Sequence, residues 1–118
     1  MATDKLNPTQ FGFLPFSKNI EEEIGGYGGE VWAASRKIQL NRPLRASQPS
    51  MDPAAVEFYK NNPRKVYPNP SNRDPWDEPP TIVRHRGENL VWTGHHRIAA
   101  ARQRGQKTMR VNYWETGQ

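Results

Sequence analysis

The residues best suited to chemistry lie together in Gly94-His95-His96-Arg97, which is followed by an alanine-rich segment. This pattern predicts a turn and then a helix, whose first N–H groups lack intrahelical acceptors and carry the positive end of the helix dipole. Such a helix start is a ready anion site. Arg97 can add a bidentate contact to phosphate, and His95 or His96 can donate hydrogen bonds or act as acid or base near neutral pH. The stretch therefore predicts a phosphate-binding turn for a nucleotide or a nucleic-acid backbone; the other interpretation is an ordinary helix start with surface histidines.

A metal site is the second chemistry that these residues allow. His95 and His96 are adjacent, so on a helix their side chains diverge by about 100° and do not form a chelate by themselves. His85, on a neighbouring strand, could come close to them. The candidate oxygen ligands, if the preceding loop folds over the turn, are Asp74, Asp77 and Glu78. The chain has no cysteine, which excludes disulfides, thiolate nucleophiles and cysteine zinc sites.

Positive charge is concentrated around the turn. The net charge is +5, and residues 1–80 hold ten basic and ten acidic residues, whereas residues 81–118 hold seven basic and two acidic ones. The resulting field favours an anionic partner at the turn. Four arginines are expected either to widen the phosphate site into a basic surface or to form a solvated face: Arg84, Arg86, Arg102 and Arg104.

The composition indicates one small domain outside the membrane. A chain of 118 residues is typical of a single domain. Only 34% of the residues are hydrophobic and eleven are proline, which is about twice the usual ~5% share of proline, so we expect a modest core and long loops. No apolar run approaches the ~18 residues of a membrane span, and the N-terminus lacks the pattern of a signal peptide. We therefore expect a cytoplasmic protein with no membrane partner.

The pattern of apolar residues and breakers predicts an α+β fold. Asp52 and Pro53 mark the start of a helix, and Pro63 stops it. Two β-rich runs joined through Gly87 predict a hairpin, and Gly105 is suited to ending the helix that follows the histidine turn. The expected strands lie at 37–40, 81–86, 90–93 and 108–114, and the expected helices begin at 53 and at 95. Together they predict a small mixed sheet with a helix on one face, beginning after Gly94.

The chain is expected to divide into an N-terminal arm with a glycine-rich hinge at 1–30 and a domain at 31–118. The aromatic cluster at 11–16 could pack on the core or bind a partner, and Glu21-Glu22-Glu23 is interpreted as a solvated turn. Residues 63–80 hold six prolines. A loop of this length without regular structure is usually functional or mobile, so it could be a lid over the site or a linker.

The C-terminal half runs Pro79-Pro80-Thr81-Ile82-Val83, a hairpin, Thr93 to Ala101 with the histidine turn inside it, and then Gly105. This order resembles the ParB/sulfiredoxin-like fold, the family of ParB-like nuclease domains, over residues 37–115. The resemblance implies nucleotide-phosphate binding at the Gly94–Arg97 turn. It also implies a nucleoside triphosphate, ATP or CTP, with Mg²⁺ as the cofactor.

The chain departs from this family at the positions that carry chemistry. Sulfiredoxins have their reactive cysteine where this chain has His95, so their repair reaction is not expected here. Many relatives have an aspartate where this chain has Thr93, which weakens a metal or base role at that point. Kinase relatives need a catalytic glutamate near the N-terminus, for which Glu30 is the candidate.

Three functions follow as expectations. The first is a stand-alone, small member of this fold, suited to a phage or mobile element, that binds DNA or a nucleotide and acts in DNA metabolism as a nuclease or nucleotide hydrolase, with His95 or His96 as acid or base. The alternative is a non-enzymatic protein that binds and modulates a host protein through the aromatic arm or through Trp76. The third is a nucleotide-dependent small-molecule kinase.

Overall fold

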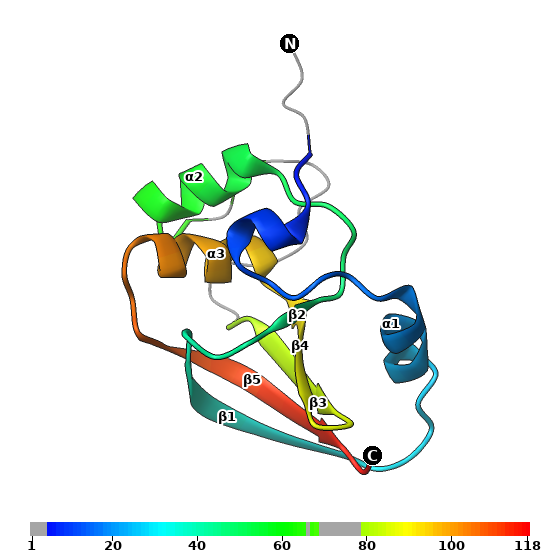
Figure 1. Cartoon of the computed structure of the whole chain (residues 1–118). Coiled ribbons are helices and arrows are strands. Elements are labelled where there is room, and N and C mark those ends of the chain that lie inside the picture. The colour runs from blue at the N-terminus through cyan, green and yellow to red at the C-terminus, as the bar shows by residue number, and fades with distance from the viewer. Residues whose placement is uncertain (1–4, 66, 69–78) are drawn as a thin grey trace.

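The structure is a computed structural model, which describes residues 5–65, 67–68 and 79–118. In these residues one 3-10 helix, three α-helices and five strands form an α+β fold (Figure 1). In chain order they are η1 Pro8–Phe11, α1 Lys18–Gly25, β1 Val31–Gln39, β2 Arg45–Ala46, α2 Pro53–Asn61, β3 Thr81–His85, β4 Glu88–Thr93, α3 His95–Gln103 and β5 Thr108–Thr116.

The five strands form one mixed sheet in the order β1-β5-β3-β4-β2. The β1–β5 and β3–β4 pairs are antiparallel, whereas the β3–β5 and β2–β4 pairs are parallel. The predicted mixed sheet and the predicted hairpin are therefore confirmed. The hairpin turns at Arg86 and Gly87, which both have positive φ, of 52° and 80°. Two such residues match the right-handed twist of the strands they join.

Both helices that the sequence predicted are present. In α2 the side chain of Asp52 accepts a hydrogen bond from the Ala54 N–H, and Pro53 occupies the first turn. In α3 the helix begins directly after Gly94 and ends at Gln103, one residue before Arg104 and two before the left-handed Gly105. The two helices lie side by side above one end of the sheet (Figure 1).

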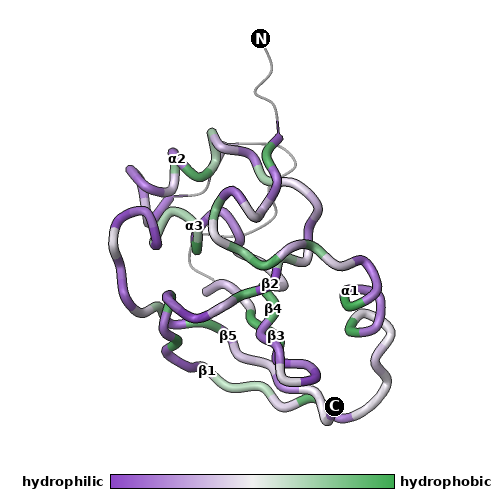
Figure 2. The backbone as a smooth tube through the Cα atoms, viewed as in Figure 1, coloured by the Kyte–Doolittle hydropathy of each residue, from purple (hydrophilic) through white to green (hydrophobic). Residues whose placement is uncertain are grey.

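The core forms where α3 meets the sheet and α2 packs on α3. Ile98 and the three alanines that follow it are almost fully buried against Ile82, Val91 and Val111. The small alanine side chains let the helix backbone lie close to the strands. Figure 2 shows hydrophobic segments of β4 beneath α3 and a hydrophilic stretch in β1.

The N-terminal segment contributes to the same core. Phe13 is only 4% exposed, and Phe11 and Phe16 pack against the buried cluster. Single β-bridges join Leu6 to Met51 and Leu14 to Arg45. The structure therefore shows the aromatic cluster packed on the core, which is one of the two roles proposed for it.

Two elements differ from the predictions. The interpretation of Glu21-Glu22-Glu23 as a turn is wrong, because these residues lie within α1, which begins after Ser17, whose hydroxyl accepts a hydrogen bond from the Ile20 N–H. Strand β1 begins at Val31 rather than near residue 37. Its residues are exposed on both faces over most of its length, so no alternation of apolar residues marks it, and pairing with β5 defines it instead.

Most of the proline-rich loop at 63–80, including Trp76, falls outside the described residues. In the parts of the chain that are described, no helix is long and apolar enough to span a membrane.

Two left-handed glycines allow a matched test of the turn before α3. A Cβ on Gly94 would lie 2.5 Å from the Pro80 Cβ, whereas a Cβ on Gly105 would meet no atom within 4 Å. We expect Gly105→Ala to lower the free energy of unfolding by about 1 kcal/mol, the cost of a left-handed L-residue. Gly94→Ala should lower it by roughly 3 kcal/mol, because overpacking adds about 1–3 kcal/mol. Urea unfolding followed by tryptophan fluorescence measures both, and equal losses would contradict the close contact.

Candidate functional site

The turn between β4 and α3 places the predicted phosphate site where several elements meet. Gly94 adopts φ 90° and ψ 22° as the N-cap of α3 and supplies no side-chain cap. Pro80, just before β3, lies against it so closely that only glycine fits without displacement. The helix start is thus held against the adjoining end of β3.

His95 is buried and bound to the backbone rather than exposed. It is 2% exposed, its Nε2 accepts a hydrogen bond of 3.0 Å from the Ser47 N–H just after β2, and its ring packs at 5.7 Å from the ring of Phe13. Burial, with a smaller contribution from the adjacent His96, lowers the pKa of His95 to about 3. Its proton is therefore on Nδ1, and the lone pair that a general base would use is already engaged.

His96 also accepts a backbone hydrogen bond, but from a different segment. Its Nε2 accepts a hydrogen bond of 3.0 Å from the N–H of Asp52, the N-cap residue of α2. The divergence of adjacent helical side chains lets the two histidines reach two segments, the exit of β2 and the start of α2. The sequence analysis did not predict this role. The divergence of the two adjacent side chains was the one signal in the sequence that could have indicated it.

Arg97 brings a positive charge into the first turn of α3. The residue is only 8% exposed, so its guanidinium lies largely out of water beside the positive end of the helix dipole. Gly94, His95, His96 and Arg97 are thus brought together as predicted, with the two histidines acting as hydrogen-bond acceptors.

The four arginines of the predicted basic surface do not form one surface. Arg86 pairs with Glu23 at 2.6 Å. Arg102 donates to three backbone carbonyls, among them that of Leu40 at 2.8 Å, and burial lowers its pKa. Arg104 donates to the Tyr59 carbonyl at 3.0 Å. Arg84, the fourth, lies half exposed on the sheet.

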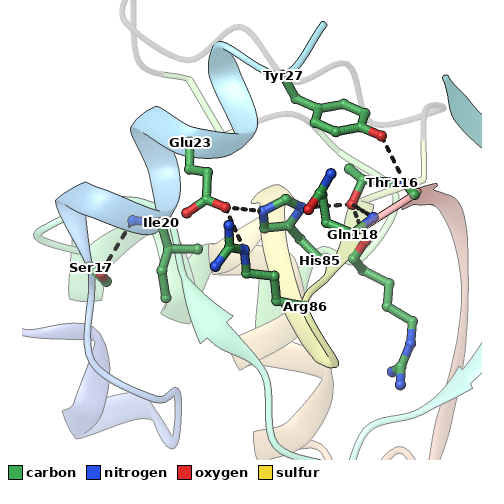
Figure 3. A network of polar contacts seen from close by, with 10 residues as sticks. Ser17, Ile20, Glu23, Tyr27, His85, Arg86, Thr116 and Gln118 are labelled. Carbon is green, nitrogen blue, oxygen red and sulfur yellow. Dashed lines mark hydrogen bonds and ion pairs between the residues drawn. The ribbon is translucent and has the colours of Figure 1, made fainter. Parts of the chain in front are cut away.

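His85 lies at the other end of β3 from Thr81, about 13 Å along the strand at 3.3 Å per residue. Its Nε2 donates to the Glu23 carboxylate at 2.8 Å, and its Nδ1 contacts the Thr116 hydroxyl at 2.6 Å (Figure 3). The hydrogen bond from His85 holds the pKa of Glu23 below its usual value. His85 therefore does not join the histidine turn in a metal site.

The order of hydroxyl, imidazole and carboxylate in this network is that of a nucleophilic triad. Thr116 and His85 are, however, only 6% and 3% exposed, so a substrate has no access to the hydroxyl. The network instead fastens α1 to the sheet, which matters because none of the residues of α1 is buried. Figure 3 shows Glu23 of α1 and Thr116 of β5 on opposite sides of the His85 ring.

The remaining predicted site residues lie elsewhere. Glu30 is exposed and comes just before Val31, which pairs with Thr116 at the end of the sheet opposite the histidine turn. Among the residues that the structure covers, no group of three or more histidines or acids could hold a metal ion. The three candidate metal ligands, Asp74, Asp77 and Glu78, lie outside the described residues.

The buried state of His95 predicts a pH dependence of stability. Between pH 6.5 and about 3 the unfolded chain binds a proton at this residue that the folded chain excludes. Stability therefore falls as the pH falls below 6.5, by up to about 1.4 kcal/mol per pH unit from this group. His95→Gln keeps an acceptor near the position of Nε2 and removes the titration. We expect its unfolding free energy, from urea titrations at several pH values, to decline less steeply in acid than that of the wild type; parallel curves would contradict the assignment.

The segment that carries the resemblance, Thr93 to Ala101, forms the end of β4, the glycine turn and the first two turns of α3. No protein-family model matches the sequence, and no curated protein matches it significantly.

Proposed function

We propose that this protein is a ParB/sulfiredoxin-like domain that binds the phosphate groups of a nucleotide or of nucleic acid at the start of α3. The observation that carries the proposal is the joint placement of an uncapped, left-handed Gly94 and the largely buried Arg97 in one helical turn. The order of hairpin, glycine turn, helix and closing strand supports the fold assignment.

The electrostatics of the turn favour an anion. The first N–H groups of α3 have no intrahelical acceptor and carry the positive end of the dipole. Arg97 adds a full positive charge in the same turn, and its planar guanidinium suits the paired oxygens of a phosphate. The absence of a side chain on Gly94 lets Pro80 pack against the turn and hold the start of α3 in place.

The histidines position this turn in the proposed function. Since the Nε2 atoms of His95 and His96 accept backbone hydrogen bonds, both rings tie the start of α3 to neighbouring segments. The depressed pKa of His95 keeps that ring neutral at physiological pH. We therefore propose binding, and not acid–base catalysis by His95, as the activity of the turn.

Nucleotide titrations test the proposal. When ATP or CTP with Mg²⁺ is added to the wild-type protein, we expect the backbone amide resonances of Gly94 to Ile98 to shift and calorimetry to report binding. Arg97→Gln should weaken affinity about 10- to 100-fold, since a hydrogen bond to a charged group contributes roughly 1.5–3 kcal/mol.

Lys107→Gln is the matched control, because it removes the same charge from an exposed position beyond the end of α3. Its affinity should stay close to that of the wild type. The amide shifts are measured on the wild type, so they remain decisive if Arg97→Gln fails to fold. Absence of both shifts and heat at millimolar nucleotide would overturn the proposal.

A further inference from the structure

One face of the sheet is partly uncovered along β1 and β5. Helix α3 covers the part of this face that contains Ile82, Val91 and Val111. The same face continues along β1 and β5, where a groove of about 330 Å³ lies between the strands and the loop that follows β1. Its lining includes Arg36, Lys37, Arg42, Arg84, Asn89 and Tyr113.

The groove carries an excess of positive charge. Arg84 lies 3.7 Å from Glu115, but both side chains are close to half exposed, and exposed ion pairs of this kind contribute little. Arg36 and Arg42 have no carboxylate within ion-pair distance in the described part of the chain. Three guanidinium groups thus face one acid, which favours a polyanion in the groove.

Aromatic groups lie beside these charges. The guanidinium of Arg36 stacks over the ring of Tyr113 at 4.7 Å from its centroid. Trp32 is 74% exposed and lies four residues before Arg36 on β1, so the two side chains share a face. Its partner across the strands is Glu115, next to Arg84. A large ring of this exposure offers a flat surface to a planar ligand.

We propose that this groove binds single-stranded nucleic acid, with phosphates at the three arginines and a base stacked on Trp32. Cations that follow a backbone, combined with exposed rings, are the usual means of binding single strands without sequence preference. An acidic peptide would use the charges but would leave Trp32 without a role. No residue of the Gly94–Arg97 turn lines the groove, so this inference goes beyond the proposed nucleotide site and does not depend on it.

Strands β1 and β5 supply matched variants for the test. Arg36 pairs with Val111, so the exposed Arg110 beside Val111 lies on the opposite face of the sheet, and Trp32 and Trp114 likewise lie on opposite faces. The probe is a fluorescent oligothymidylate of about twelve nucleotides, within the usual range of single-strand site sizes. Its anisotropy is followed at several salt concentrations.

We expect Arg36→Gln and Trp32→Ala each to weaken binding about tenfold, in line with the roughly 1–3 kcal/mol measured for stacking of a base. Arg110→Gln and Trp114→Ala, on the opposite face, should change affinity little. Arg36→Gln should also reduce the salt slope by about 0.7, the value for one phosphate contact on a single strand. All of these side chains are largely exposed, so the variants should fold.

Three results would overturn the inference. Equal losses in Arg36→Gln and Arg110→Gln would show attraction by net charge alone. Equally tight binding of duplex DNA would show that the groove does not select single strands. Competition by polyglutamate at the same charge concentration would show that the groove recognises acidic chains. The Arg36→Gln variant should keep its nucleotide affinity, so failure of either site is visible separately.

Discussion

The contact between Gly94 and Pro80 is the constraint on which the placement of α3 depends. Pro80 precedes β3 and Gly94 follows β4, and the antiparallel pairing of these strands brings the two residues together. Since no side chain fits between them, α3 leaves the sheet at a fixed point. From there its alanine-rich face covers Ile82 and Val91, and its first turn reaches the segments after β2 and before α2.

Residues that suggest catalysis by their type serve here to hold the backbone. An imidazole accepts a backbone N–H only through an unprotonated ring nitrogen, so such a bond favours the neutral form of the ring. His95 and His96 use this property to tie three elements together. The proposed binding at the turn rests on the electrostatics of the helix start and on the positive charge of Arg97.

In the folded chain, the arginines of the C-terminal third have different roles. Arg102 donates to the carbonyls of Gly12 and Leu40, in two N-terminal segments, and Arg86 forms an ion pair with Glu23 of α1. Arg84 instead joins Arg36, from the charge-balanced part of the sequence, in the groove on the sheet. The basic surface of the protein is therefore made partly by residues that the charge distribution along the chain did not mark.

The sequence by itself determined the elements that short-range physics controls. Asp52 and Pro53 start α2, the turn at Gly87 joins β3 to β4, and Gly94 and Gly105 bound α3, because caps and left-handed positions depend on neighbouring residues alone. These elements also placed the histidine turn correctly at the start of a helix.

Only the tertiary structure decided the length of β1, the presence of α1 and the roles of the charged and histidine side chains. Strand β1 exists because β5 pairs with it, and α1 is fastened by a bond between Glu23 and His85, 62 positions apart. Whether a histidine is a base or an acceptor, and whether an arginine is free or engaged, depends on the partner that the fold brings within hydrogen-bond distance. Such partners lie tens of residues away, beyond the reach of any local pattern in the chain.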